Sequence, residues 1–349
     1  MTPVQARATF PVLERLAYLN TGTCGPLSRR TVRAMSEWHE LDMVDGRSGR
    51  ARREAGSDAR ARLGERLGAL LNVSPDCLVL TSSTTEGCNI VVTGLQLQPD
   101  DEVVTTDAEH PGLLAPLSAS GAVIREARVL DRPAAEALEV LFEAVTPRTR
   151  LIALSHVLWM NGQVLPLEEI KRRTGLPLLV DGAQSVGAVP VDASVADYYT
   201  VSGQKWLCGP ELTGALYVAD HTTLRPRIAG FGAMHFEGAD RLGLLHHPVG
   251  LLAGLLAAVE DLPEWGLERA SDLAARCRAA LLDAGRRVHG QPGEGTLIAF
   301  EVEGDPVEAV ERARNRNVVV RHLPNGWVRA SVGWWNDEAD IGRLVQAFD

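Results

Sequence analysis

Short apolar runs alternate with amphipathic stretches up to residue 218. Most of the runs are apolar at successive positions, which is typical of strands buried on both faces of a parallel sheet. The stretches between them, such as 133–145 and 167–173, repeat apolar residues at helical spacing. This alternation predicts an α/β domain with a mostly parallel seven-stranded sheet and helices on both faces. The seven runs cover residues 77–80, 102–106, 122–124, 151–154, 176–180, 198–201 and 214–218.

The pattern changes after residue 250. Two long helical stretches are followed by shorter strand and helix patterns, which predicts a smaller α+β domain. The patterns cover residues 251–262, 270–287, 296–302, 306–314, 318–321, 327–331 and 337–348. Because the first twenty residues are too few to fold alone, we expect them to pack against this domain. The predicted parts are an N-terminal segment (1–20), a large domain (21–250) and a small C-terminal domain (251–349).

The composition is that of a globular chain, with 45% hydrophobic and 23% charged residues among 349. A formal net charge of -10 argues against nucleic acid as a partner, because phosphate binding needs clustered Lys and Arg. The longest apolar stretch, 249–259, is too short to span a membrane, and the first residues lack the apolar core of a signal peptide. Five cysteines without a C-x-x-C pair indicate neither a disulfide framework nor a metal site. We therefore expect a cytoplasmic protein.

Two polar segments follow predicted strands, where ligands of open α/β sheets bind. T-S-S-T-T-E-G-C-N, which contains Thr84 and Thr85, follows the run 77–80 and leads into a helical pattern. Its hydroxyls and free backbone N–H groups suit a phosphate, although an ordinary Ser/Thr helix cap explains them equally well. D-A-E-H-P-G follows the run 102–106, and His110 within it offers an aromatic face. A surface histidine or a hydrogen-bonded core histidine is the alternative.

A carboxylate and an amine also follow predicted strands. Asp181 ends the apolar run 176–180, and Lys205, one of only two lysines in the chain, lies in V-S-G-Q-K-W-L-C-G-P after the run 198–201. The two could form a buried ion pair. They also suit pyridoxal phosphate (PLP): Lys205 would form an imine with the aldehyde, and Asp181 would keep the pyridine nitrogen protonated. His110 would then stack on the ring, and the phosphate would lie on Thr84, Thr85, Ser202 and Gln204.

Five segments together resemble the class V aminotransferase-like enzymes of fold type I in order and spacing. They are T-S-S-T-T-E-G-C-N, D-A-E-H-P-G, S-H-V-L-W-M-N-G-Q-V-L-P-L, D-G-A-Q-S-V-G and S-G-Q-K-W-L-C-G-P. The resemblance covers about residues 19–218 well and the rest loosely. It implies a PLP enzyme with Lys205 as the Schiff-base lysine, Asp181 on the ring nitrogen and His110 stacked. It further implies that Gln184 meets the phenolic oxygen, that Asn20 lines the substrate pocket, and that sites form at a homodimer interface.

The chain departs from the family pattern in two places. Gln204 stands before the lysine where most relatives have histidine, so this position can donate to phosphate through its amide but carries no charge. Relatives also have a Gly-Thr-Pro stretch whose threonine reaches the partner subunit's phosphate. Here the corresponding region is L-L-H-H-P, in which His246 or His247 could substitute, or the two could simply face solvent.

The family contains cysteine desulfurases, isopenicillin N epimerases and cysteine/cystine C–S lyases. V-R-A-S-V-G-W-W-N resembles the stretch whose arginine binds the α-carboxylate, here Arg329, although a strand arginine paired with a surface acid is possible. A desulfurase needs a cysteine on a mobile loop of the small domain, but Cys277 lies within a helical pattern. Trp159, where desulfurases commonly carry Asn, is most similar to the C–S lyases, and a packing tryptophan is its alternative.

The predicted reaction is therefore an α,β-elimination from cysteine, cystine or an S-substituted cysteine. Lys205 would remove the Cα proton, and the products would be pyruvate, ammonia and a sulfur compound. A class V aminotransferase and an amino-acid epimerase stay open because they would use the same residues. A cysteine desulfurase or a non-catalytic binding protein on this fold is disfavoured.

Overall fold

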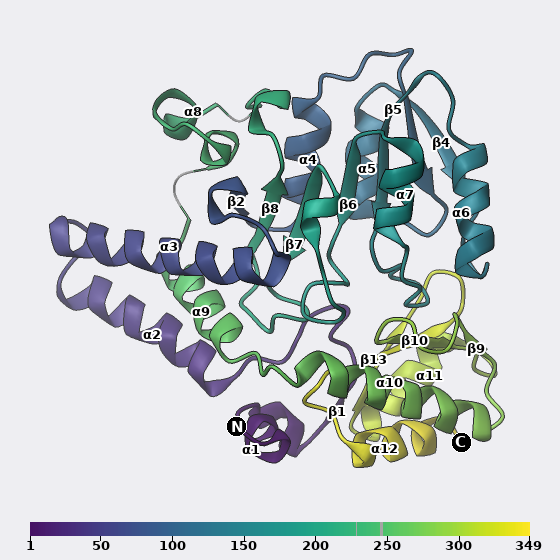
Figure 1. Ribbon diagram of the computed structural model, residues 1–349. Helices are drawn as coiled ribbons and strands as arrows, with labels where there is room; N and C mark the ends of the chain where they lie inside the picture. Colours follow the sequence, from purple (N-terminus) through teal and green to yellow (C-terminus); the bar gives the residue numbers. More distant parts are fainter. Residues whose placement is uncertain (228, 245–246) are drawn as a thin grey trace.

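The computed structural model describes residues 1–227, 229–244 and 247–349. The seven predicted runs form one sheet, whose strands are β2 (Leu78–Thr81), β3 (Glu102–Thr106), β4 (Val123–Ala127), β5 (Thr149–Ser155), β6 (Leu178–Asp181), β7 (Tyr198–Ser202) and β8 (Gly214–Val218). Their order is β2-β8-β7-β6-β5-β3-β4 (Figure 1). Only the pairs that β8 makes with β2 and β7 are antiparallel. The predicted mostly parallel sheet is confirmed.

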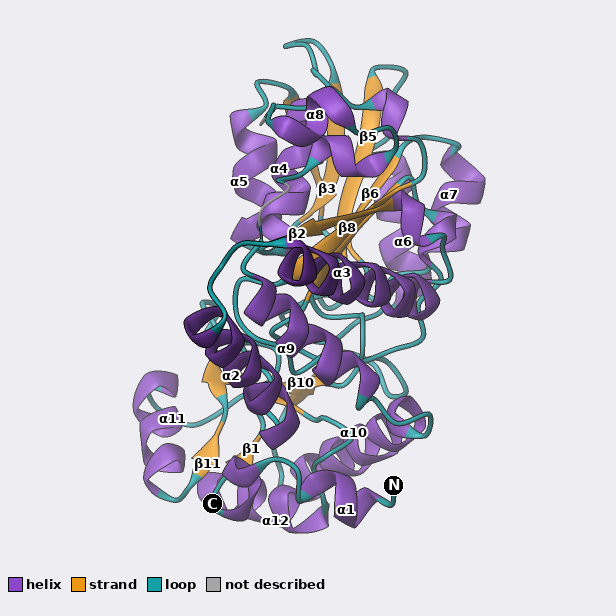
Figure 2. Cartoon of the chain, turned by 90° about the vertical axis from the view of Figure 1, so that its left-hand side faces the viewer, coloured by secondary structure: helices purple, strands orange, loops and turns teal. Residues whose placement is uncertain are grey.

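Helices cover both faces of this sheet, because successive strand residues point to opposite sides. Leu78 and Leu80 of β2 belong to one core and Val79 to the other. The first core includes side chains of α3 (Arg50–Leu71), α6 (Ala134–Glu143) and α7 (Leu167–Thr174). The second includes side chains of α4 (Thr84–Gly94) and α5 (Pro111–Ala119). Figure 2 shows this layered domain above a smaller one.

The smaller domain contains a four-stranded antiparallel sheet of order β12-β13-β10-β9. Its strands are β9 (Val288–His289), β10 (Leu297–Phe300), β12 (Arg321–His322) and β13 (Val328–Ser331). Side chains of α10 (Gly266–Asp283), α11 (Pro306–Asn315) and α12 (Glu338–Phe348) pack into its core. The prediction of a small C-terminal α+β domain is confirmed.

The prediction of one strand at 318–321 is wrong, because this segment forms two short strands that belong to two different sheets. β11 (Val318–Val319) pairs in parallel with β1 (Ala17–Tyr18), whereas β12 pairs with β13. The split depends on the N-terminal segment, which supplies a neighbour for β11 alone. Hydrophobic patterning cannot reveal this because both halves of the segment read as strand.

The first twenty residues lie against the smaller domain. They form α1 (Pro3–Arg7), the 3₁₀ turn η1 (Pro11–Glu14) and β1. The guanidinium of Arg7 donates to both carboxylate oxygens of Asp340 on α12, at 2.7 and 3.1 Å. The ring of Phe10 packs edge-on against Trp334, with 5.6 Å between centroids.

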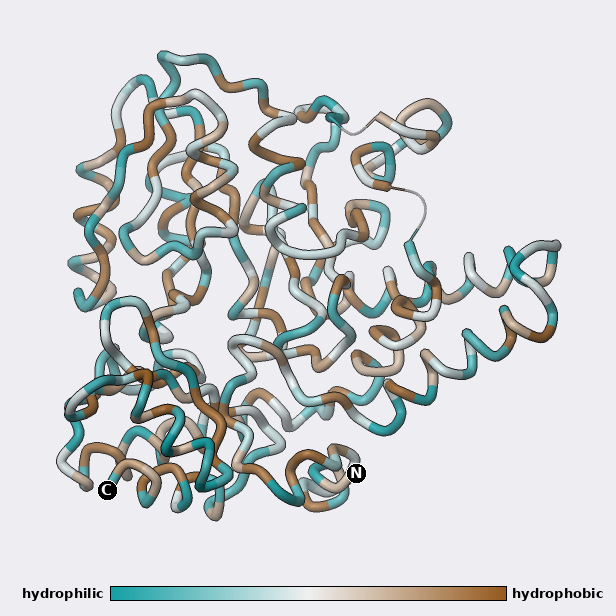
Figure 3. Tube along the Cα trace, turned by 180° about the vertical axis from the view of Figure 1, so that it is seen from behind, coloured by the Kyte–Doolittle hydropathy of each residue, from teal (hydrophilic) through white to brown (hydrophobic). Residues whose placement is uncertain are grey.

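The helix after residue 250 packs with the larger domain. α9 (Val249–Glu260) contacts α2 (Arg29–Val44) and α3, and its Leu252 and Leu255 belong to the first core of the large sheet. Figures 1 and 3 show α2 and α3 projecting together from the body of the molecule. A pattern of apolar residues shows that a helix is buried but not what buries it. In place of the boundary at 250 we therefore propose one after α9.

Short elements connect the rest of the chain. They are η2 (Pro75–Cys77), η3 (Ala193–Val195), η4 (His221–Thr223), α8 (Phe231–His235) and η5 (Ala239–Leu242). No helix in the described ranges combines the length and the apolar character that a membrane crossing requires.

Candidate active site

The carboxyl ends of β5, β6 and β7 bring the candidate residues to one edge of the sheet. Asp181 ends β6 and pairs in register with Ser155 of β5, and Lys205 follows the last residue of β7 by three positions. Asp181 is buried, and its Oδ1 accepts hydrogen bonds from the Ala183 N–H at 2.9 Å and the Thr200 hydroxyl at 3.4 Å. The carboxylate is therefore held in place, as a partner for a buried cation must be.

The surroundings of the Lys205 amine make its neutral form more accessible than it is for an exposed lysine. Burial lowers the pKa of Lys205 to about 8; the nearby Asp181 carboxylate opposes this shift, and Arg329 and Arg321 add to it. A neutral amine is the nucleophile that imine formation needs. The loop that contains Lys205 packs tightly against Gly25, since a Cβ on Gly25 would lie 2.2 Å from the Lys205 carbonyl oxygen. Only glycine allows this close approach.

We expect the rate of PLP incorporation into apoenzyme to rise with pH and level off above about pH 9. With a pKa near 8, the neutral fraction of Lys205 grows from roughly 0.1 at pH 7 to roughly 0.9 at pH 9. Stopped-flow absorbance after mixing apoenzyme with PLP measures this rate. A lysine derivative blocked at its α-amine serves as the control, and its rate should keep rising beyond pH 9. An enzyme rate that also rises without levelling would contradict the lowered pKa.

His110 is the N-cap of α5 and contacts Trp159. Its Nδ1 accepts the Gly112 N–H at 3.0 Å, so a neutral ring carries its proton on Nε2. The rings of His110 and Trp159 meet edge to face, with centroids 5.2 Å apart. Burial lowers the pKa of His110, the Lys205 charge lowers it further, and Asp181 opposes. A neutral aromatic ring is therefore available beside Lys205 and Asp181.

Hydroxyl groups lie along the same edge of the sheet, near the ends of β7 and β2. Ser202 pairs with Gly214, which pairs in turn with Thr81 at the end of β2. α4 starts three residues after Thr81 with Thr84, whose side chain is buried. A Cβ on Gly112 would lie 2.6 Å from Thr85 Oγ1, which places the exposed Thr85 beside the first turn of α5. Helix-start N–H groups and hydroxyls together can bind a phosphate.

Two predicted ligands already have partners of their own. Gln204 donates from Nε2 to Cys24 Sγ at 3.7 Å, so its amide is directed at the thiol. Gln184 is buried, donates to the Gly22 carbonyl at 2.9 Å and accepts from Trp206 Nε1 at 3.0 Å. Because an amide nitrogen carries two hydrogens, Gln184 keeps one donor for a phenolic oxygen.

Arg329 is a buried cation without an acidic partner. It is fully buried, and its Nη1 donates to the Trp159 carbonyl at 2.7 Å. Its Nε and Nη2 lack hydrogen-bond partners among the residues that the structure describes, and none of the ion pairs found there includes it. Burial lowers the pKa of Arg329 to about 9. The alternative of a strand arginine paired with a surface acid is therefore wrong, and the site suits an anionic ligand.

Asn20 and the histidine pair complete the predicted set. Asn20 forms a bridge to Ser331, two residues after Arg329, and its Oδ1 accepts from Thr23 Oγ1 at 2.9 Å. His246 lies outside the described residues. His247 is half-buried, and burial, followed by the charge of Arg60, lowers its pKa. Its electrostatic partners include Glu86 on α4.

Three residues at this site were missed by sequence reasoning. Arg321 pairs with Arg329 in register and donates to Thr23 Oγ1 at 3.2 Å. Cys24 interacts electrostatically with Lys205, and burial raises the pKa of its thiol. Glu109, adjacent to His110, is buried. Two of them carried a signal in the sequence: Arg321 directly follows the apolar run 318–320, and Glu109 lies just after the predicted strand 102–106. No local feature of the sequence marked Cys24 as a site residue.

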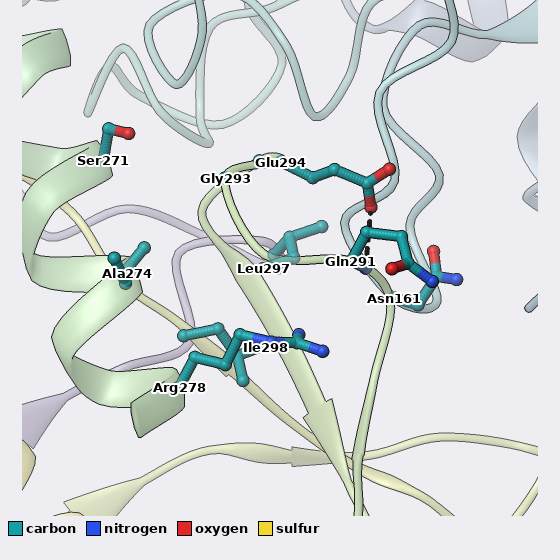
Figure 4. Close-up of a pocket in the computed structure, with 11 residues that line it drawn as sticks. Asn161, Ser271, Ala274, Arg278, Gln291, Gly293, Glu294, Leu297 and Ile298 are labelled. Carbon is teal, nitrogen blue, oxygen red and sulfur yellow. Dashed lines mark hydrogen bonds between the residues drawn. The ribbon is translucent and has the colours of Figure 1, made fainter. Parts of the chain in front are cut away.

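A small cavity lies nearby, where the smaller domain meets the loop that follows Trp159. It measures about 20 Å³, and Figure 4 shows Asn161 and Arg278 on its wall, with the Gln291 N–H bonded to Glu294 at 3.1 Å. A space of this size holds about one water molecule. It is therefore too small for a cofactor and is separate from the Lys205 site.

The fold and this constellation define a fold type I enzyme that depends on pyridoxal phosphate. The family model for class-V aminotransferases matches residues 18–282, and the chain belongs to that family. The predicted family and the predicted cofactor are confirmed, since class V aminotransferases depend on PLP.

The relatives of this chain fall into more than one reaction type. Isopenicillin N epimerase of Amycolatopsis lactamdurans is 34% identical over 94% of this chain and 93% of its own length. A probable cysteine desulfurase of Mycolicibacterium paratuberculosis is 31% identical over 77% of this chain, which spans 43% of that relative. The cystine C–S lyase C-DES, solved with its reaction product cysteine persulfide, has a TM-score of 0.91 and 28% identity over 97% of this chain and 99% of its own.

The residues present fit the cofactor by their chemistry. The site offers an amine for the aldehyde, a fixed carboxylate for the pyridine nitrogen, a neutral imidazole for the ring face and hydroxyls for the phosphate. Another C-DES structure, a lysine-to-alanine mutant with glycine covalently linked to its PLP, has a TM-score of 0.92 over 98% of this chain and 99% of its own, with 28% identity. The roles of the individual residues here stay predictions.

Proposed function

We propose that the protein is a PLP-dependent C–S lyase that cleaves cystine, and related S-substituted cysteines or cysteine, by α,β-elimination. The observation that carries this proposal is a pair of arginines. Arg321 and Arg329 stand directly opposite each other on β12 and β13, so their side chains leave the sheet on the same face.

Two like charges in register destabilise a sheet unless something neutralises them. Their guanidinium carbons lie 5.8 and 6.0 Å from the ring centroid of Trp159, so both approach the same aromatic residue. Neither has an acidic partner among the ion pairs found in the described ranges. A substrate with two carboxylates would neutralise both arginines, and cystine is such an amino acid.

The chain's own groups then divide the work. Arg329 would hold the α-carboxylate, because a guanidinium binds a carboxylate in a bidentate manner. The bound cofactor supplies an electron sink for the negative charge left at Cα. Lys205 would take the Cα proton; the electron pair then forms the Cα–Cβ double bond while the Cβ–S bond breaks, and the sulfur departs with its electrons. Water converts the aminoacrylate to pyruvate and ammonia.

Cystine should react faster than cysteine because a persulfide is a better leaving group than a thiolate. C-DES, whose reaction product is cysteine persulfide, supports this choice. Cys277, the one cysteine in the described part of the smaller domain, does not favour a desulfurase. Cys277 is fully buried in α10, and burial raises the pKa of its thiol to about 12, which suits packing and not nucleophilic attack.

The test is to incubate the purified holoenzyme with cystine, cysteine and S-substituted cysteines without any 2-oxo acid. We expect stoichiometric pyruvate and ammonia, with the highest kcat/KM for cystine. Solvent deuterium entering Cα without pyruvate would instead support an epimerase, as the Amycolatopsis relative suggests. A requirement for a 2-oxo acid would indicate an aminotransferase. Persulfide retained on the protein and lost in Cys24→Ser would indicate a desulfurase.

We predict that Arg321→Ala raises KM for cystine by about tenfold to a hundredfold, because a hydrogen bond to a charged group contributes roughly 1.5–3 kcal/mol. The same change should affect KM for S-methylcysteine, which has one carboxylate, by less than about threefold. Steady-state kinetics with both substrates measure the difference. Equal effects on the two substrates would contradict a role of Arg321 in binding a second carboxylate.

The oligomeric state and the cellular location are proposed from the resemblance to the family. We propose a homodimer that acts on a small-molecule amino acid in the cytoplasm. Sedimentation of the holoenzyme tests the oligomeric state.

A further inference from the structure

One carboxylate in the loop between β3 and α5 lies outside the roles assigned above. Glu109 directly precedes His110 and is 5% exposed. Its Oε1 accepts the Thr106 hydroxyl at 2.6 Å, and the Ser155 N–H lies 3.0 and 2.9 Å from its two oxygens. Its Oε2 also accepts the Ser155 hydroxyl at 2.5 Å. Three donors from two strands therefore converge on one side chain.

These contacts connect two groups that are predicted to face the cofactor. Ser155 ends β5 and pairs in register with Asp181, the proposed partner of the pyridine nitrogen. Thr106 ends β3, and His110 follows Glu109 at the start of α5. Glu109 thus links the end of β3, which precedes His110, to the end of β5, which lies beside Asp181.

We propose that Glu109 is a positioning residue that holds His110 at the separation from Asp181 which a pyridine ring requires. This proposal rests on the PLP site of the proposed function but not on the reaction carried out there. The proposed role requires a side chain as long as that of glutamate, because the carboxylate must extend from the loop to the backbone N–H of Ser155 in β5. Burial raises the pKa of Glu109 to about 7, so donors on both oxygens are needed to offset the loss of water.

The other side of the same loop provides a control. Asp107 accepts the N–H groups of Val129 and Leu130 at 2.8 and 3.0 Å, and its side chain is exposed on the side of β4, away from β5 and β6. Asp107→Ala removes two hydrogen bonds from the loop without touching the link to Ser155. It therefore separates general loosening of the loop from the specific effect of Glu109.

The experiment compares Glu109→Asp, Glu109→Gln and Asp107→Ala with the unchanged enzyme. Aspartate keeps the charge but is one methylene too short to reach Ser155, whereas glutamine keeps the reach and an acceptor. The measurements are the PLP dissociation constant, the visible circular dichroism of bound PLP, which reports the orientation of its ring, and the melting temperature of the apoenzyme.

We expect Glu109→Asp to weaken PLP binding by about tenfold and to change the dichroic band, because it leaves buried donors unsatisfied. Glu109→Gln should stay within about threefold and keep the band, and Asp107→Ala should lower only the melting temperature. A lower melting temperature of Glu109→Asp with an unchanged band and affinity would overturn the proposal, as would an equal loss of affinity in Asp107→Ala. If Glu109→Asp does not fold, Thr106→Val replaces it, and an unchanged band and affinity there would count against Glu109.

Discussion

Replacing Lys205 by alanine is expected to lower kcat/KM for cystine by about 10⁴-fold, because this amine is the proposed proton acceptor in the elimination. The variant also loses the amine that we propose to bond covalently to the cofactor. Pyruvate release measures the activity, and reduction with borohydride followed by mass spectrometry of the peptides locates the bound cofactor. In the unchanged enzyme we expect the label on Lys205.

The chain offers a matched control because its only other lysine is Lys171. Lys171 lies at the opposite end of the sheet, where its amine donates to Asp197 and to the Leu176 carbonyl. Lys171→Ala should remain labelled and keep its activity within about threefold, since a partly exposed ion pair contributes little to the site. Activity retained in Lys205→Ala, or label found on Lys171, would refute the assignment.

Replacing Asp181 by asparagine is expected to lower kcat by about 10³-fold, because it removes the negative charge proposed to keep the pyridine nitrogen protonated. Asparagine keeps the acceptor for the Ala183 N–H, so the loop after β6 should stay in place. Single-turnover kinetics with cystine measure the chemical step, and PLP titration measures cofactor binding separately.

Asp197→Asn is the control for this change. Asp197 accepts the Leu178 N–H at the amino end of β6 and pairs with Lys171, so its loss should lower the melting temperature without reducing kcat more than about twofold. A comparable fall in kcat for both variants would mean that Asp181 acts through the stability of the strand.

Much of the site could be predicted because its residues share a local signal. Each of Thr84, His110, Asp181 and Lys205 follows an apolar run directly or within a few residues, and parallel strands carry their carboxyl ends to one edge. The five motifs around them define the family. Local sequence was therefore sufficient for the sheet, the cofactor and the principal candidates.

The remaining features depend on which distant segments meet. That Arg321 stands opposite Arg329 is a matter of register between β12 and β13, and the strand that contains Arg321 was expected to be continuous with residues 318–319. α9 reads as a buried helix in either domain, and only its contacts with α2 and α3 assign it to the larger one. Cys24 lies beside Lys205 because the chain just after the N-terminal segment passes the loop that follows β7, where the Gly25 N–H donates to the Gln204 carbonyl at 2.7 Å.

By itself the sequence determined the seven strands, the helices between them and the chemistry at the strand ends, because hydrophobic periodicity and polar breaks act over a few neighbouring residues. Only the tertiary structure decided which cations oppose each other, which strands Glu109 joins and which core buries α9. Those features depend on register and packing between segments far apart in the chain, where one hydrophobic pattern is compatible with several partners.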